Sequence, residues 1–397
     1  MSADLADTPA RYDAANRATL EWLLSRSPVQ GVFINTRVNP VSGSDYSAAD
    51  GLRGPDWICG WIQGRGLEAL ATFAAHYQMA RPDLAARLDA LARPLYARLC
   101  ALRAEHGHGC FLYDKALTPV RRDGKGGVVA QTLTADLFSY SDIFLAKGLI
   151  AAAARYAPGD LPQHLAFFHK IRAAIEDGRF QMDEQAEISR AAIAAEPDDH
   201  GPRMILLGAA GMLKRAGLAE EAGWAGDMIH HVLDHWVDDT GLLRNVPGMD
   251  ALNAGHGIEF VGFAFDHIGA DGDPALKERL AAVLIRLFDH AFRMPGIPLA
   301  VSAASGELLA PWFPWWPLPE TIRAAALARA SGAPQVADLK RIQTLADTAF
   351  FSHYWRGPMG FAYQGRTQDG PADYVPATPD LDPGYHTGLS LLAAQTA

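Results

Sequence analysis

Apolar residues recur at intervals of three and four along most of the chain. The run Leu84, Leu88, Leu91, Leu95 and Leu99 is one example, and this spacing puts its members on one face of an α-helix. The pattern continues from end to end and predicts about twelve or thirteen amphipathic helices. Besides helices around 67–77 and 84–102, the predicted ranges are 13–25, 137–157, 160–177, 183–195, 201–216, 219–237, 256–269, 274–293, 319–331, 335–353 and 383–395.

Strand patterns are scarce. Few runs alternate with the two-residue period of a half-buried strand, so we expect little β-structure. The best candidates are loop hairpins at Gly109–Tyr113 and Gly360–Gln364. The chain is therefore predicted to be all-α, with small β-hairpins in its loops.

Helices joined in pairs over 397 residues can form an open solenoid or a closed toroid. Six pairs would use roughly 66 residues each, more than the ~33 to 47 of the common open helical repeats, and no fixed-period echo is visible. We therefore expect an (α/α)6 barrel, a toroid of about twelve helices that forms a single catalytic domain over residues 1–397. Its long loops, rich in Gly, Pro, Ser and Asp, should build one working face. These loops are Asn39–Pro55, Thr118–Gly127, Asp238–Gly255, Met294–Pro319 and Arg356–Pro383.

Composition narrows the class of protein further. With 49% hydrophobic and 20% charged residues the chain can bury a large core. Its formal charge of −10 repels phosphate backbones and anionic lipids, so neither nucleic acid nor a membrane is an expected partner. The segment Met1–Ala10 carries two aspartates and lacks the basic start and apolar run of a signal peptide. Because Cys59, Cys100 and Cys110 are too few for a disulfide framework and lack CxxC spacing, we expect a reducing cytoplasm and no structural zinc.

His256 and Glu259 stand three residues apart where a Gly-rich loop enters an apolar helix. At this spacing both side chains share a face, so the carboxylate can orient the imidazole or engage the same substrate. The alternative is structural: His256 caps the helix and Glu259 favours its positive N-terminal end.

His386 also stands where a Pro/Gly/Asp loop enters an apolar helix. Two such histidines, far apart in sequence, can converge on one cavity if the helices close into a toroid. Each can take or deliver a proton near neutral pH without a metal. A histidine beside a surface turn is the alternative.

Arg65 lies early in an apolar helix, where a guanidinium facing a cavity could serve as a donor; an exposed arginine on the wet side is the alternative. Trp312, Trp315 and Trp316 crowd a Pro-rich loop. Aromatic faces in a cleft are a common platform for the CH faces of sugars. A cluster that merely packs the loop is equally compatible with the pattern.

Metal and nucleotide sites have no support in the sequence. His231 and His235 have helical metal-ligand spacing but no third ligand nearby, and no intervening glutamate. No GxGxxG follows a strand, and Walker A and GxSxG motifs are missing. We therefore expect no metal and no cofactor.

These motifs, in this order, resemble the N-acylglucosamine 2-epimerase superfamily, which includes cellobiose 2-epimerases, mannose isomerases and sulfoquinovose isomerases. Trp61-Ile-Gln-Gly-Arg65 looks like the family's Trp-x-Gln-x-Arg, and Gly-His256-Gly-Ile-Glu259 is similar to its Gly-His-x-Ile-Glu. Trp315-Trp316-Pro-Leu-Pro-Glu320 looks like its Trp-Trp-Pro-x-x-Glu, and His386 matches a histidine of its last helix. The resemblance covers roughly residues 57–390 and implies an (α/α)6 barrel.

The resemblance implies aldose–ketose or C2-epimer interconversion of a reducing sugar through a cis-enediol. His386 would be the principal base and His256 its partner, Glu259 would orient His256 and assist ring opening, and Arg65 would donate to the carbonyl oxygen. A small sugar would be the partner of a monomer or homodimer. The residues expected to contact it are Trp61, Arg203, Trp312, Trp316, Glu320 and Asp382.

One departure from the family affects the substrate site. Many members carry Asn-x-x-Met-His-x-x-Glu, where this chain has Pro202–Ala209 without that histidine and glutamate.

Two other functions stay open. One is an inverting glycoside hydrolase that uses two of Asp380, Asp382, Glu259 and Glu320. The other is a sugar-binding or interaction protein that has lost catalysis.

Overall fold

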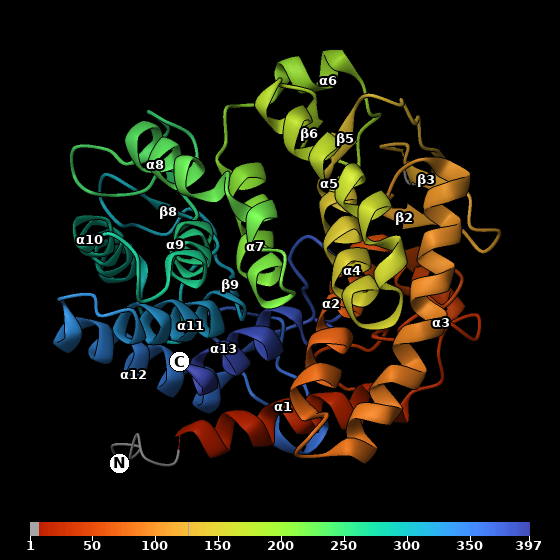
Figure 1. Ribbon diagram of the computed structural model, residues 1–397, viewed down its shortest axis with the longest axis horizontal. Helices are drawn as coiled ribbons and strands as arrows, with labels where there is room; N and C mark the ends of the chain where they lie inside the picture. Colours follow the sequence, from red (N-terminus) through yellow and green to blue (C-terminus); the bar gives the residue numbers. More distant parts are fainter. Residues whose placement is uncertain (1–7, 126) are drawn as a thin grey trace. The chain divides into compact units, whose positions relative to one another are not determined.

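Amphipathic helices form in nearly every range where the three-to-four spacing predicted them (Figure 1). The computed structural model describes residues 8–125 and 127–397. Residues 1–7, part of the segment that argued against a signal peptide, and Gly126 of the loop Thr118–Gly127 lie outside the described residues. The helices are α1 (Thr8–Ser25), α2 (Gly60–Tyr77), α3 (Pro82–His106), α4 (Tyr140–Tyr156), α5 (Leu161–Glu176), α6 (Arg190–Ala195), α7 (Gly201–Arg215), α8 (Ala225–Trp236), α9 (Ala254–Ile268), α10 (Pro274–Ala291), α11 (Pro317–Ala330), α12 (Val336–His353) and α13 (Ser390–Thr396).

The described chain divides into two compact units. The first comprises the described part of Met1–Thr19 together with Asp198–Pro376 and His386–Ala397, and the second comprises Leu20–Pro197 and Ala377–Tyr385. We call them the histidine unit and the arginine unit, after His256 and His386 in the first and Arg65 in the second. The single domain over residues 1–397 stays a prediction.

In the arginine unit, α2 packs against both α3 and α4. A Cβ on Gly148 of α4 would lie 2.4 Å from the Gly64 carbonyl oxygen of α2, so the two helices approach closely only because glycine stands there. β1 (Ile58–Cys59), β2 (Leu112–Tyr113), β3 (Pro119–Arg122) and β4 (Val128–Ala130) form an antiparallel sheet in that order. β5 (Phe138–Ser139) pairs in parallel with β6 (Phe180–Gln181). These short strands anchor the chain beside the first turns of α2 and α4.

In the histidine unit, α9 packs against α7, α10 and α11, and α11 packs against α12 and α13 (Figure 1). Two small antiparallel sheets lie in its loops. β7 (Ala251–Leu252) pairs with β8 (Val301–Ser302), and β10 (Gly365–Arg366) lies between β9 (Phe313–Pro314) and β11 (Pro371–Ala372). The pairing of β7 with β8 fixes the chain directly before α9.

Several predicted boundaries were wrong. The predicted helix 183–195 begins only at Arg190, because the Ser189 side chain caps α6 by accepting from the Ala192 amide. The predicted helix 219–237 is a short 3-10 turn, Ala219–Ala222, followed by α8.

The C-terminal helix and one hairpin also differ from the prediction. The predicted helix 383–395 opens with a π-helical turn, Tyr385–Leu389, before α13. The hairpin expected at Gly360–Gln364 forms its strand β10 just after Gln364, since Gly360 is itself in a left-handed turn with φ 73°.

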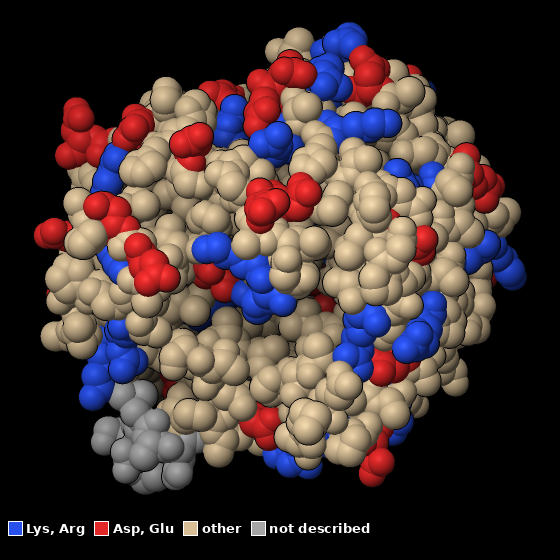
Figure 2. All heavy atoms as spheres, viewed as in Figure 1, with Lys and Arg blue, Asp and Glu red and all other residues tan. Residues whose placement is uncertain are grey.

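Basic and acidic side chains are interspersed over the face that Figure 2 shows. Among the helices within residues 8–125 and 127–397, none combines the length and apolar character that crossing a membrane requires.

Candidate active site

Two histidine rings of the histidine unit lie against one indole. The Trp316 ring centroid is 5.4 Å from that of His256 and 5.6 Å from that of His386. Trp316 directly precedes α11, His256 is in the first turn of α9, and His386 is in the π-helical turn before α13. A Cβ on Gly255 would lie 2.5 Å from the Trp316 ring, so glycine permits the indole to pack onto the start of α9. The three elements thus bring two candidate proton carriers to one aromatic side chain.

His386 is paired with a buried carboxylate. Its Nδ1 lies 3.0 Å from Glu320 Oε1 and 3.8 Å from Glu259 Oε1. Glu320 also forms an ion pair with Arg323, three residues further along α11. Burial alone would raise the pKa of Glu320, but Arg323 and the hydrogen bond with His386 outweigh it and hold that pKa below its usual value. Glu320 is therefore an anion at neutral pH, able to stabilise a positive charge on His386.

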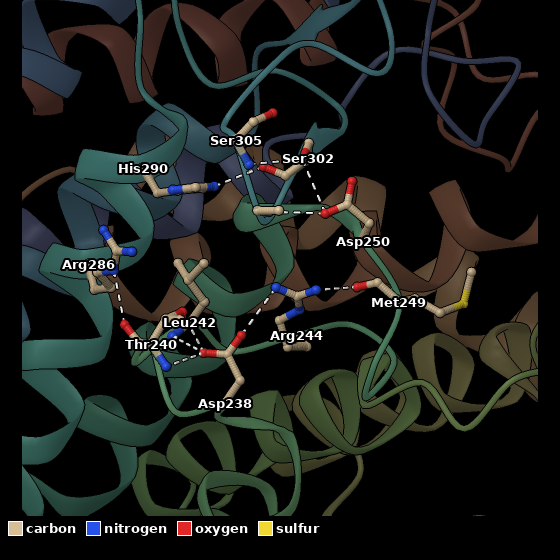
Figure 3. Close-up of polar contacts among 11 residues, drawn as sticks. Asp238, Thr240, Leu242, Arg244, Met249, Asp250, Arg286, His290, Ser302 and Ser305 are labelled. Carbon is tan, nitrogen blue, oxygen red and sulfur yellow. Dashed lines mark hydrogen bonds and ion pairs between the residues drawn. The ribbon is translucent and has the colours of Figure 1, made fainter.

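His256 has an amide partner. Its Nδ1 lies 3.4 Å from Nδ2 of Asn245, a residue in the loop between α8 and α9. Asp238, Arg244 and Asp250 hold this loop through hydrogen bonds to the backbone and to neighbouring side chains (Figure 3). Glu259, predicted to orient His256, forms its ion-pair contact with His386.

Arg65 lies among aromatic rings of the arginine unit. The carbon atom of its guanidinium is 4.0 Å from the ring centroid of Phe144, 5.0 Å from that of Trp61 and 5.4 Å from that of Tyr385. The Tyr385 hydroxyl lies 2.5 Å from Nζ of Lys147, a fully buried lysine. Cation–π contacts of this kind hold a guanidinium in place without neutralising its charge. The side chain is thus fixed and remains a positively charged donor.

Trp61 is fixed by a buried carboxylate of the same unit. Its Nε1 donates to Glu184 Oε2 at 2.5 Å, and the Ser139 hydroxyl donates to Glu184 Oε1 at 2.6 Å. Burial raises the pKa of Glu184 to about 7, although these hydrogen bonds lower it in part. Glu184 therefore orients a candidate sugar-binding ring.

The other predicted substrate residues lie in varied surroundings. Arg203 Nη1 lies 3.7 Å from Asp198 Oδ1, and the guanidinium lies over the Trp236 ring. Trp312 stacks on Tyr374 with ring centroids 4.5 Å apart. Asp382 accepts a hydrogen bond from the Tyr385 amide. Within one unit, the structure brings together His256, Glu259, Trp316, Glu320 and His386.

Sequence reasoning missed five residues of these surroundings. They are Asn245, Glu184, Lys147, Arg323 and His200. His200 precedes α7, its ring packs against Phe260, and burial lowers its pKa to about 3. A charged residue within an apolar run, such as Lys147 within α4, was one available signal. The partner of Glu184 is too distant in sequence to be visible in a local pattern, and the role of Asn245 depends on the direction of its side-chain amide.

One group among the described residues could hold a metal ion. Ligand atoms of Glu259, Glu320 and His386 all lie within 4.8 Å of one another. The local histidine spacing in the sequence did not predict this group. Arg323 already supplies a positive charge to Glu320, one of the two carboxylates, without a metal.

No family model matches the sequence, and no curated protein matches it significantly. Solved structures do. D-mannose isomerase is similar with a TM-score of 0.75 at 14% identity, over 100% of both chains. Cellobiose 2-epimerase from Spirochaeta thermophila DSM 6192 is similar with a TM-score of 0.71 at 15% identity, over 99% of this chain and 96% of that one. A glucoamylase from Hormoconis resinae gives a TM-score of 0.52 at 11% identity, over 99% of this chain and 74% of that one.

These identities are low, so the likeness establishes the fold. It confirms the predicted all-α class, the helical toroid with small sheets in its loops. The fold that the motif resemblance implied is thus confirmed.

Proposed function

We propose that this protein is a sugar isomerase or 2-epimerase that interconverts a reducing aldose with its ketose or its C2 epimer. The observation that carries the proposal is the pair of imidazoles on Trp316, each with a polar partner at Nδ1. Such a pair suits a reaction that consists of proton transfers at two adjacent carbons. The shared fold with D-mannose isomerase and cellobiose 2-epimerase supports the same reaction class.

His386 is the base in this proposal. With Nδ1 directed at Glu320, its Nε2 takes the proton from C2 of the open-chain aldose. The electron pair of that C–H bond forms the C1=C2 bond, and the carbonyl π electrons move to O1, which receives a proton from His256 or solvent. The product is a cis-enediol. Return of a proton to C1, with loss of the O2 proton, gives the ketose, whereas return to the opposite face of C2, with loss of the O1 proton, gives the epimer.

Charged groups around the two histidines support this sequence of steps. Glu320 stabilises the imidazolium that forms when His386 takes the proton, in the way that a buried carboxylate assists a catalytic histidine in hydrolases. Arg323 keeps Glu320 ionised. Glu259, also near His386, assists opening of the sugar ring.

Other side chains bind the substrate in this proposal. Arg65 donates to the carbonyl oxygen as negative charge develops there, the task of a preorganised electrostatic donor. Trp316 and Trp61 present aromatic surfaces to the CH faces of the sugar. Trp312, Arg203, Glu320 and Asp382 are proposed as further contacts.

The proposed chemistry uses no metal and no nucleotide, because two imidazoles suffice for the proton transfers. The proposal also keeps the expected cytoplasmic location, with a small sugar as the partner of a monomer or homodimer and without nucleic acid.

An inverting glycoside hydrolase is the second candidate, favoured by the likeness to glucoamylase. Inverting enzymes place two carboxyl groups about 6.5–9.5 Å apart to admit a water. Glu259 and Glu320 have oxygens within 4.8 Å of each other, which is closer than that chemistry needs. Asp380, another carboxylate considered for this role, forms a buried ion pair with Arg37 at 3.6 Å.

A panel of reducing sugars, incubated with the protein in deuterated water and followed by NMR, tests the proposal. An isomerase gives a ketose or a C2 epimer with deuterium at the exchanged carbon. A hydrolase instead cuts disaccharides without such exchange. Tight binding of a sugar with neither reaction would identify a sugar-binding protein that lacks catalysis.

A further inference from the structure

We propose that Asn245 is a positioning residue that fixes the tautomer of His256, with the proton on Nε2. The inference about the tautomer stands on geometry. Its consequence for turnover rests on the proposed function. Asn245 lies in the loop between α8 and α9, nine residues before Ala254, where α9 begins.

The orientation of the Asn245 amide is settled by a second contact. The backbone N–H of Asn253 donates to Asn245 Oδ1 at 2.7 Å, and a backbone amide can only donate. The oxygen end is therefore identified, and the NH2 end faces His256 Nδ1 at 3.4 Å. Because an amide NH2 can only donate, Nδ1 of His256 must accept. A neutral imidazole that accepts at Nδ1 carries its hydrogen on Nε2.

Asn245 is itself held in place. It is only 8% exposed, and its backbone carbonyl oxygen accepts a hydrogen bond from the backbone N–H of His200 at 3.1 Å. Arg244, the preceding residue, donates to Asp238 on one side of the loop and to the Met249 carbonyl on the other (Figure 3). These hydrogen bonds link the part of the loop before Asn245 to the part after it. The amide is thus presented to His256 by a restrained backbone.

His200 and Trp316 are two neighbours of His256 that come from other elements. His200, buried beside it, has a lowered pKa and stays neutral. Trp316, directly before α11, packs against the His256 ring with centroids 5.4 Å apart. Arg203 of α7 has an ion-pair contact with Asp198, and Glu259, on the same helix as His256, has one with His386.

The two histidines are therefore held in complementary states. Glu320 accepts from Nδ1–H of His386, which leaves Nε2 as the basic nitrogen, whereas the Asn245 amide makes Nε2 of His256 a donor. In the proposed reaction this gives His386 the role of base and His256 that of the group that donates to O1. The two rings differ because a carboxylate, Glu320, lies beside His386, whereas an amide, Asn245, lies beside His256.

The tautomer is tested by NMR of protein labelled with 15N in its histidine rings, with the His256 signals identified by their loss in His256→Asn. The expected result is an unprotonated Nδ1 and a protonated Nε2 at pH 8. The matching variant is Asn245→Asp, which keeps an acceptor for the Asn253 amide but should draw the proton to Nδ1. Gln368→Glu, which makes the same amide-to-acid change at an exposed site, is the control.

Kinetics then test the consequence. Asn245→Asp should lower kcat about 10- to 100-fold with little change in KM, since a wrong tautomer affects the proton transfer rather than binding. It should also introduce a new ionisation into the pH profile of kcat, which a purely structural role would not do. Gln368→Glu should leave both unchanged.

The outcomes separate the two proposals. A wild-type His256 protonated on Nδ1, or an Asn245→Asp variant with unchanged ring signals, would overturn the inference whatever the activity. If no sugar is converted, the ring signals still decide the tautomer, and the proposed function fails separately. If the tautomer changes in Asn245→Asp but kcat does not, Asn245 does not position His256 for the reaction and the inference is again overturned.

Discussion

Two buried carboxylates, Glu320 in the histidine unit and Glu184 in the arginine unit, have opposite pKa shifts. Glu320 faces the cation Arg323 and the ring of His386, and these contacts lower its pKa despite burial. Glu184 accepts hydrogen bonds from Trp61 and Ser139, which are neutral, so burial prevails and its pKa rises to about 7. The nature of the partner, rather than burial, decides whether a carboxylate stays ionised.

The comparison assigns different tasks to the two carboxylates. An anion beside His386 can stabilise an imidazolium during turnover. A carboxyl group that is close to half-protonated at neutral pH serves better to hold the Trp61 indole in place. Substitutions of His386, Arg65, Glu320 and Glu184 and removal of metal ions test these tasks and the proposed site, from the largest expected effect to the smallest.

His386→Asn should have the largest effect. Removal of the proposed base should lower kcat by about 10²- to 10⁴-fold, because general acid–base steps typically contribute that much to the rate. The fold should stay intact. Steady-state kinetics and circular dichroism measure the two properties. His235→Asn, at an exposed histidine, is the control and should behave as wild type. Near-full activity of His386→Asn would remove His386 from the role of base.

Arg65→Ala should lower turnover by about 10²- to 10³-fold if the guanidinium donates to the developing oxyanion. Arg65→Lys keeps the charge but loses the planar fork and its stacking on Phe144, so it should retain more activity than alanine and less than wild type. The loss should appear in kcat if the contact strengthens in the transition state and in KM if it serves substrate binding. Arg190→Lys, on an exposed surface, is the control. Indifference of both constants to Arg65→Ala would contradict the role.

Glu320→Gln replaces the carboxylate that pairs with Arg323 and His386 by a neutral amide. We expect kcat to fall about 10- to 100-fold and the free energy of unfolding to fall by about 3–5 kcal/mol, because Arg323 loses its partner in a buried site. In the wild type, the stability supplied by the lowered pKa of Glu320 is present above the usual value of 4.5 and is lost as the pH falls through the lower, folded-state value.

Urea unfolding of Glu320→Gln from neutral to acidic pH checks that sign. The variant should show a shallower loss of stability in acid than the wild type. An equally steep acid limb in both proteins would show that Glu320 does not contribute in this way.

Glu184→Gln should change stability more than chemistry. Because burial raises the pKa of Glu184 to about 7, the wild type loses stability as the pH rises from 4.5 to 7. The variant has no group to ionise there, so its unfolding free energy should fall less over that interval. Glu307→Gln, at an exposed glutamate, is the control and should follow the wild type. A variant with an unaltered pH dependence would contradict the raised pKa.

Chelation should have the smallest effect. Exhaustive treatment with EDTA should leave turnover unchanged, because Arg323 already provides the positive charge beside Glu320 and the proton transfers need only imidazoles. A loss of activity that Mn²⁺, Co²⁺ or Zn²⁺ restores would instead make Glu259, Glu320 and His386 metal ligands.

The sequence predicted the helical class well, because three-to-four spacing reports directly on helical faces. Boundaries failed where a single polar cap or turn decided them, as at Ser189 and Gly360. The motifs also indicated His256 and Glu259, since both follow one loop and share one helix face.

The partners of the site residues were much harder to predict. Glu184 is 123 residues from Trp61, and Glu320 is 66 residues from His386. No periodic pattern records such pairs, because they arise only when separate helices pack. Asn245 lies closer to His256 in sequence, yet its role depends on the direction of one amide, which only the contact with Asn253 reveals.

The most direct test of the central claim is deuterium incorporation at C2 of a substrate sugar, measured by NMR in deuterated water. Wild type, His386→Asn and the control His235→Asn are compared at equal concentration. We expect rapid exchange in wild type and in the control, and exchange reduced at least about 100-fold in His386→Asn, since the base that removes the C2 proton is missing. Exchange at C2 that proceeds at the wild-type rate without His386 would contradict proton transfer by this histidine.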